Sequence, residues 1–196
     1  DKEWTVILDL LGVKADEIPQ EVTETFRRTG NASGVIAWAE AEQIEPSRDD
    51  WDEFMADPAV SEETRSALVK LQRSNEAKAI AELLRVPLSK IPKDILLDHT
   101  STGNVSGIID WAAKDGIEPS AEAWEDFAGN PSISDETLKD FERFKNDTET
   151  RAQAEFEAIA QLFGVPAKDL PETLRTNSSA LVDWAKDRGL QPTEDQ

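Results

Sequence analysis

The sequence contains no cysteine, and this absence excludes several kinds of chemistry. None of its 196 residues can form a disulfide bridge, bind a metal as a thiolate or act as a thiol nucleophile. A protein without cysteine tolerates oxidising and reducing compartments alike, so the localisation stays unknown. The chain also has a single histidine, His99, so it cannot form the histidine clusters that bind metals.

Positive charge is also scarce. The 41 Asp and Glu residues outnumber the 21 Lys and Arg residues and give a formal net charge of -20 at pH 7. Nucleic acids and anionic membrane surfaces carry charge of the same sign, so we predict no direct nucleic acid binding. No apolar run approaches the roughly 20 residues that span a bilayer, and no signal peptide is recognisable. We therefore expect a soluble chain without membrane insertion.

What the chain does contain is a repeated motif. Trp38, Trp111 and Trp184 are each 73 positions apart, and the residues around them agree: residues 31–39 read NASGVIAWA, 104–112 NVSGIIDWA and 177–185 NSSALVDWA. The first two copies align without a gap, whereas the third begins at an offset of 79 and then returns to 73. Repetition of this kind is typical of stacked structural units.

The alignment divides the chain into helical repeat 1 at residues 1–73, helical repeat 2 at 74–152 and a partial helical repeat 3 at 153–196. The position after Gln196 would align with Trp51 and Trp124. A fragment of a longer repeat array and a natural terminal capping repeat are both consistent with this pattern.

Each copy is predicted to be helical. Apolar residues recur at i, i+3 and i+4 in the opening segment, as at Ile7, Leu10 and Leu11. No run shows the two-residue alternation of a strand. A long helix should join each copy to the next, with a bend near the polar residues 146–150. We therefore predict an all-α tandem helical repeat, with two full copies of about 73 residues and a partial third, elongated through the joining helices.

Polar residues stand where several helices should begin. Ser47 and Ser120 fit the N-caps of the fourth helix in their copies. Asn31, Asn104 and Asn177 precede the repeated motif and can accept hydrogen bonds from the first turn of its helix. Because each also opens an Asn-x-Ser sequence, a role as a glycan acceptor stays open beside capping.

The third copy lacks about six residues that correspond to 98–103 of the second copy. Deletions are tolerated best in exposed connections, so we expect this stretch to be a surface loop. His99 lies within it, and we expect an exposed histidine that takes no part in any activity shared by the copies.

The chain has six Trp and seven Phe but no Tyr, which is an unusual choice of aromatic residues. Burying a tryptophan removes about 150–250 Å² from water, so we expect Trp38, Trp111 and Trp184 to lie in the core. Trp51 and Trp124 are flanked by carboxylates, and two interpretations stay open for them: packing between repeats, or anchoring a partner at an acidic rim. The candidate partner-binding residues are Trp51, Phe54, Trp124, Phe127, Asp52 and Glu125.

No motif for catalysis, cofactor binding or metal binding stands out. A phosphate-binding glycine loop, zinc-ligand spacing and a calcium loop are all missing from the sequence. We therefore predict no catalytic residues, no cofactor and no metal.

Repeat proteins are more often binding surfaces than enzymes. We predict a non-enzymatic protein–protein interaction or structural module, an accessory or scaffold subunit of a larger assembly, whose protein partner has a basic surface. The alternative is an acidic DNA-mimic decoy that blocks a nucleic-acid-binding protein.

Overall fold

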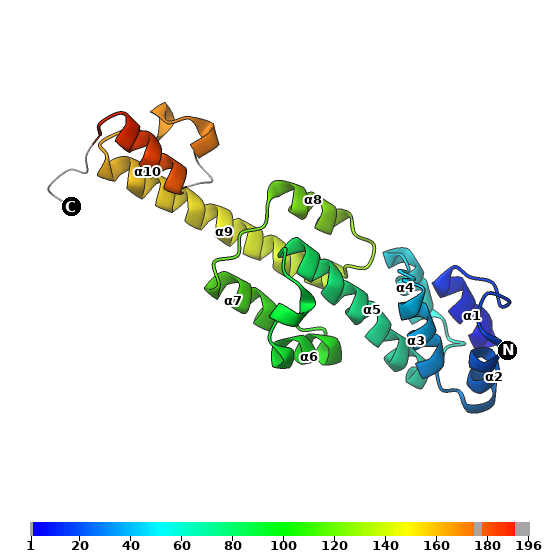
Figure 1. Cartoon of the computed structure of the whole chain (residues 1–196). Helices are drawn as coiled ribbons and strands as arrows, with labels where there is room; N and C mark the ends of the chain where they lie inside the picture. Colours follow the sequence, from blue (N-terminus) through cyan, green and yellow to red (C-terminus); the bar gives the residue numbers. More distant parts are fainter. Residues whose placement is uncertain (1, 175–177, 191–196) are drawn as a thin grey trace. The chain divides into compact units, whose positions relative to one another are not determined.

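The computed structural model describes residues 2–174 and 178–190, and all regular secondary structure in this part of the chain is helical (Figure 1). Its ten α-helices are α1 (Lys2–Leu11), α2 (Gln20–Thr29), α3 (Ser33–Ala41), α4 (Arg48–Ala56), α5 (Glu62–Leu83), α6 (Lys93–Thr102), α7 (Ser106–Lys114), α8 (Ala121–Gly129), α9 (Asp135–Leu162) and α10 (Ser178–Asp187). Three 3-10 turns accompany them, η1 (Leu88–Lys90), η2 (Ala167–Asp169) and η3 (Glu172–Leu174). The predicted all-α class is confirmed.

Helix boundaries in the first two copies follow the 73-residue spacing of the sequence. The helices α2, α3, α4 and α5 begin 73 residues before α6, α7, α8 and α9 respectively. The eight described residues with positive φ occupy three positions of the aligned copies: Gly12, Arg85 and Gly164; Gly30 and Gly103; and Gln43, Gly116 and Gly189. Each follows the end of a helix, where a left-handed residue allows the chain to turn away.

The fourth helix of each of the first two copies, α4 or α8, begins at its predicted N-cap. The Ser47 hydroxyl accepts a hydrogen bond from the Asp50 N–H (3.2 Å), and the Asp50 carboxylate accepts one from the Ser47 N–H (3.0 Å), which completes a capping box. The Ser120 hydroxyl accepts from the Ala123 N–H (3.3 Å). Both predicted N-caps are confirmed.

The asparagines before the repeated motif accept hydrogen bonds at the helix starts, but they are not the N-cap residues. The Asn31 and Asn104 side-chain oxygens accept hydrogen bonds from the N–H groups of Ser33 (2.8 Å) and Ser106 (3.0 Å), the first residues of α3 and α7. The N-caps themselves are Ala32 and Val105, so the asparagines supply the predicted acceptors from one position earlier. Asn177 lies outside the described residues.

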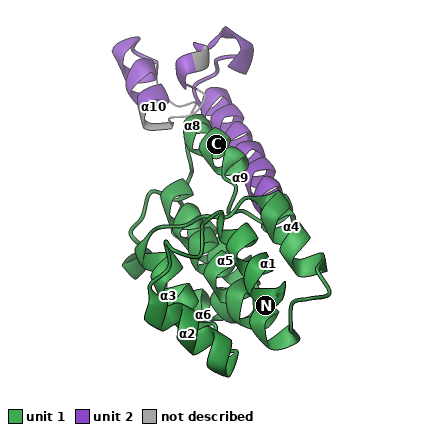
Figure 2. Cartoon of the chain, turned by 90° about the vertical axis from the view of Figure 1, so that its right-hand side faces the viewer, with its two compact units in different colours: residues 1–140 green, residues 141–196 purple. Residues whose placement is uncertain are grey.

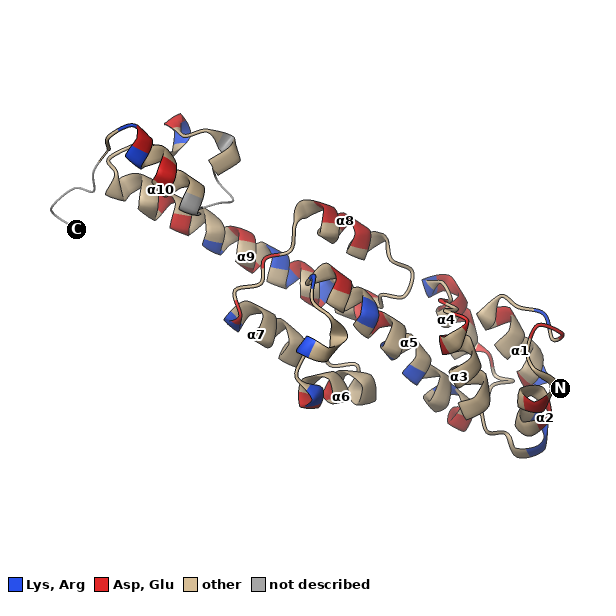
Figure 3. Ribbon diagram, viewed as in Figure 1, with Lys and Arg blue, Asp and Glu red and all other residues tan. Residues whose placement is uncertain are grey.

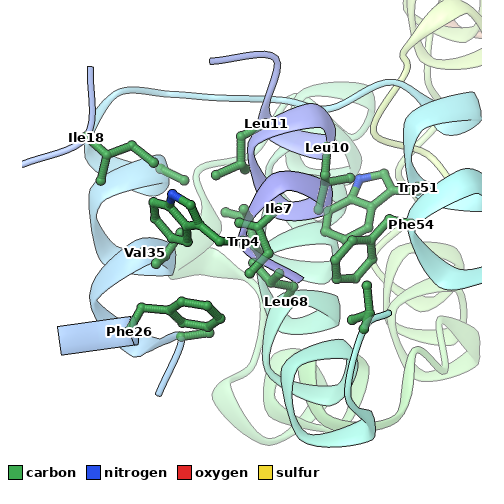
Figure 4. Close-up of a cluster of buried hydrophobic side chains, with 14 residues drawn as sticks. Trp4, Ile7, Leu10, Leu11, Ile18, Phe26, Val35, Trp51, Phe54 and Leu68 are labelled. Atoms are coloured by element: carbon green, nitrogen blue, oxygen red, sulfur yellow. The ribbon is translucent and has the colours of Figure 1, made fainter. Parts of the chain in front are cut away.

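Two compact units make up the chain, residues 1–140 and residues 141–196 (Figure 2). In the first unit, α1 packs on α4, α2 on α3, and α5 on α3, α6 and α8. The core of the first copy surrounds α1: Trp4 meets Phe26 with ring centroids 5.2 Å apart, and Leu10 lies on the side of Trp51 (Figure 4). In the second unit, Phe156, Ala160, Leu170 and Leu181 form a smaller core.

Two long helices span the boundaries between copies, as predicted: α5 has 22 residues and α9 has 28. Residues 146–150 do not interrupt the helix, because α9 continues through them, and the expected bend stays a prediction. The Thr148 hydroxyl donates a hydrogen bond to the Phe144 carbonyl within the helix (2.8 Å). Polar side chains do not break a helix whose outer face is solvated.

The stretch at 98–103 is not a loop. Residues up to Thr102 belong to α6, and His99 is fully buried, with 0% of its surface exposed. The aligned position in the first copy is Phe26, which is also buried. The third copy has the short turn η3 where the second has α6. The residues that the third copy lacks therefore correspond to the C-terminal part of α6 in the second copy, and the prediction of a surface loop there is wrong.

Candidate functional site

The candidate aromatic anchors lie in the core. Trp51 is 2% exposed and Trp124 is 9% exposed, and each ring meets the phenylalanine three residues later edge-on. Phe54 and Phe127 are buried as well. An i, i+3 pair shares one helix face, and here that face packs on α1 or α5. The rings pack in the core of their own copy, so they do not form an exposed binding surface, and the packing is within a copy instead of between repeats.

The tryptophans of the repeated motif are less buried than predicted. Trp38, Trp111 and Trp184 are each half-buried. In α3 the fully buried side chains are Val35 and Ala39, one helical turn apart, and Trp38 packs beside them at the edge of the core. Side chains one full turn apart point to the same side of a helix. Trp38 lies between Val35 and Ala39 along the chain, so its side chain points partly away from the core.

A small groove lies between α1 and α4. Its apolar floor is formed by Val6, Leu10 and Phe54, and its volume is about 100 Å³. The acidic residues Asp9, Asp50, Glu53 and Asp57 line it. We call this cleft groove one.

An equivalent groove lies between α8 and the C-terminal part of α5, with a volume of about 250 Å³. We call it groove two. Every residue that lines groove one has its counterpart 73 positions later in groove two: Ala79, Glu82, Leu83, Ala123, Asp126, Phe127 and Asn130. Glu122 and Arg85 also line groove two. The same helix pair thus forms the same cleft in both copies.

Two aligned carboxylates in each groove, and Glu122 in groove two, make no side-chain hydrogen bond or ion pair within the described residues. The Asp50 carboxylate accepts a hydrogen bond from the Ser47 N–H (3.0 Å), and the Asp57 carboxylate accepts one from the Ala59 N–H (2.7 Å). In contrast, the side chains of the groove-one pair (Asp9 and Glu53) and of the groove-two pair (Glu82 and Asp126) make no hydrogen bond or ion pair within residues 2–174 and 178–190. We call these the paired groove carboxylates. Arg85 also brings a positive charge to groove two, where its guanidinium donates a hydrogen bond to the Ser120 hydroxyl (3.0 Å) and forms no ion pair with Glu82 or Asp126 within the described residues.

The helices that border the grooves are strongly acidic. Within α8 every charged residue is Asp or Glu, and α4 has Arg48 as its only basic residue (Figure 3). The predicted candidates Asp52 and Glu125 are exposed on these helices, one position before the groove residues Glu53 and Asp126. They do not line the grooves themselves.

Sequence analysis did not select the paired groove carboxylates. The pattern was nevertheless present, because an acidic residue recurs at 9 and 82 and at 53 and 126. Acidic residues that recur 73 positions apart, next to apolar residues on two helices, are the signal that identifies this pair in each copy. No group of three acidic or histidine residues is placed to hold a metal ion within the described chain.

A second polar cluster is buried beneath α6. The Glu76 carboxylate, 3% exposed, accepts hydrogen bonds from the Ser134 N–H (2.8 Å) and the Thr137 hydroxyl (2.8 Å) at the start of α9. His99 Nε2 lies 3.5 Å from the Glu76 Oε1 atom. Burial lowers the pKa of His99, although the charge of Glu76 opposes this effect. At neutral pH the ring is therefore uncharged.

We expect this histidine to make the protein less stable in mild acid. The pKa of His99 is lower in the folded state than in the unfolded state. Below about pH 6.5 the histidine is therefore protonated in the unfolded chain while it stays neutral in the folded chain. Stability is therefore lost as the pH falls from about 6.5 towards the folded pKa. Urea denaturation at pH 7.5 and at pH 5.5 should show this loss in the wild type and a smaller loss in His99→Phe. An equal loss in both proteins would contradict the assignment.

Comparisons of the chain with protein-family models, curated proteins and solved structures find no match. Function must therefore be inferred from the geometry of the chain itself. Within its described residues, no helix is both long enough and apolar enough to cross a membrane.

Proposed function

We propose that the protein is a non-enzymatic interaction module built from tandem helical repeats, and that its two acidic grooves bind a basic polypeptide partner. The observation that carries this proposal is the recurrence of one groove at seven aligned positions of the first two copies. A duplicated cleft gives two equivalent contacts in one molecule, which strengthens binding through a raised effective concentration.

The chemistry of the grooves supports a basic partner. A Lys or Arg side chain can lay its apolar stem along a floor such as Leu10 and Phe54 and place its charge beside Asp9 and Glu53. Carboxylates without a partner in the free protein lose no existing ion pair when they bind such a charge. The overall charge of -20 adds long-range steering towards basic surfaces.

The repeat architecture is supported by the helix boundaries and the left-handed positions that recur between the copies. An architecture of this kind suits a scaffold or accessory subunit, because each copy presents an equivalent surface. The proposal includes no catalytic step and no cofactor.

Binding of a fluorescent peptide with alternating Arg and apolar residues provides the test. Neutralising the groove-two pair with Glu82→Gln and Asp126→Asn should weaken binding about fivefold to tenfold, because two charged contacts are lost. Asp9→Asn with Glu53→Gln should act similarly on groove one. Fluorescence anisotropy titrations at two salt concentrations measure both effects.

The matched control is Glu142→Gln with Asp187→Asn, which changes the net charge equally at exposed positions outside the grooves. This pair should leave the affinity nearly unchanged. Equal losses in all three variants would mean that only net charge matters, and absence of binding would refute the proposal. A DNA-mimic decoy would instead bind a DNA-binding protein in direct competition with duplex DNA.

A further inference from the structure

Groove two continues into a second cleft, which has a volume of about 500 Å³. Ala79, Glu82 and Asn130 line both clefts. The other residues that line the second cleft are Gln43, Glu45 and Lys78, so it reaches from α5 to the turn that follows α3 in the first copy. We call the two clefts together the junction cleft, because residues of both copies line it.

Three charged residues of the junction cleft alternate in sign along α5 and just past its end. Lys78, Glu82 and Arg85 follow one another at i, i+4 and i+7, which is the spacing of one helix face. Lys78 lines the second cleft, Arg85 lines groove two, and Glu82 lines both. A positive, a negative and a positive charge therefore succeed one another along the junction cleft.

Both of these cations can bind a ligand. Lys78 is half-buried, and its side chain makes no hydrogen bond or ion pair within residues 2–174 and 178–190. Arg85 donates to the Ser120 hydroxyl and forms no ion pair in the same part of the chain. This single bond leaves most of the guanidinium N–H groups of Arg85 free to bind a carboxylate.

The two cations occur in the second copy alone. The aligned residues are Thr5 and Gly12 in the first copy, and Glu157 and Gly164 in the third. Arg85 has a left-handed backbone with φ 53°, as the aligned glycines have. Glycine adopts this conformation freely, whereas a residue with a side chain does not. Arginine therefore stands where glycine would be more stable, and such positions are typical of functional sites.

We propose that the junction cleft binds an extended peptide segment in which a basic residue lies between two acidic ones. The basic residue pairs with Glu82 and Asp126, and the acidic residues pair with Lys78 and Arg85. Complementary charge is what argues for this occupant. The inference rests on the proposed function, because it names the peptide that groove two selects.

The dimensions of the junction cleft suit an extended segment. Alternate side chains of an extended chain point the same way and are about 6–7 Å apart. The three charges along α5 are separated by a rise of about 6 Å and then about 4.5 Å, and long side chains can accommodate the difference. A groove of about 250 Å³ has room for a side chain and its backbone but not for a helix, whose diameter is about 10 Å.

The test uses the full chain and two labelled peptides of the same composition. One contains Glu-Ala-Arg-Ala-Glu and the other Arg-Ala-Glu-Ala-Glu within the same neutral flanks, so only the order of the charges differs. Fluorescence anisotropy at low salt should show that the first peptide binds about fivefold more tightly, because it makes two more charged contacts. The variant Lys78→Thr with Arg85→Gly should bind both peptides equally. Both changes introduce the residues of the first copy, and thermal denaturation verifies that the variant is folded.

The matched control is Lys139→Gln with Arg151→Gln, which removes the same charge at exposed positions outside the junction cleft. This control should keep the fivefold preference of about the wild-type size. Equal affinities of the two peptides for the wild type would overturn the inference. So would a preference that survives in Lys78→Thr with Arg85→Gly, or a failure of the first peptide to bind at all.

The peptide of alternating Arg and apolar residues, measured in parallel, separates this inference from the proposed function. It should bind Lys78→Thr with Arg85→Gly at least as tightly as the wild type, because two repelling charges are removed. Binding of this peptide without any preference between the two isomers would reject the inference and leave the proposed function intact. Loss of its binding would reject the proposed function itself.

Discussion

Replacing Glu76 by alanine is expected to destabilise the first unit by about 3–5 kcal/mol. The buried carboxylate accepts two hydrogen bonds from the first turn of α9, and bonds to a charged acceptor contribute about 1.5–3 kcal/mol each. Alanine would leave the Ser134 N–H and the buried Thr137 hydroxyl without an acceptor. Urea denaturation followed by circular dichroism measures the free energy of unfolding.

Glu3→Ala is the matched control, because Glu3 occupies the same position in the first copy. Its carboxylate is only half-buried, so we expect a loss of about 1 kcal/mol. Although burial raises the pKa of Glu3, hydrogen bonds from Ser61 and Thr64 outweigh it and the pKa is lowered. This stabilisation is present at neutral pH and is lost as the pH falls below 4.5. Equal losses for both variants would contradict the role of burial.

The contrast between these two glutamates shows what the sequence could and could not predict. Local rules placed the helices and caps well, because the bonds of Ser47 and Ser120 reach only three residues along the chain. The contact between Glu76 and Ser134 joins residues 58 positions apart. The sequence around either residue does not predict a contact with the other, so only the folded structure shows that they are paired.

His99 was misplaced for a related reason. The gap in the third copy predicts a loop, but the corresponding residues of the second copy lie in α6. Alignment with the buried Phe26 contained the correct information, since the two residues occupy one core position. A buried histidine beside a carboxylate is tolerated because the ring is uncharged there.

Acidic residues beside an aromatic pair led the sequence prediction to α4 and α8, but it named the aromatic rings, as packing residues or as anchors, and did not include the paired groove carboxylates. Which face of a short helix is buried depends on the helix that packs against it, and α1 and α5 bury the aromatic face here. The carboxylates then remain at the rim.

Trp51→Ala is expected to cost about 3–5 kcal/mol of unfolding free energy, and Trp38→Ala about half as much. Trp51 is almost completely buried and packs with Phe54 in the core of the first copy, so its removal loses apolar burial and leaves a cavity. Trp38 is half-buried, so water already contacts part of its ring. The change in free energy should follow the area that each ring buries.

The pair of variants also separates core packing from partner binding. If alanine at 51 unfolds the first unit, Trp51→Phe keeps most of the buried area and should cost about 1–2 kcal/mol. A folded Trp51→Phe protein should bind the basic peptide as the wild type does, because the paired groove carboxylates are intact. A larger loss of stability for Trp38→Ala than for Trp51→Ala would show that the repeated motif, and not the α4 aromatic pair, forms the main core.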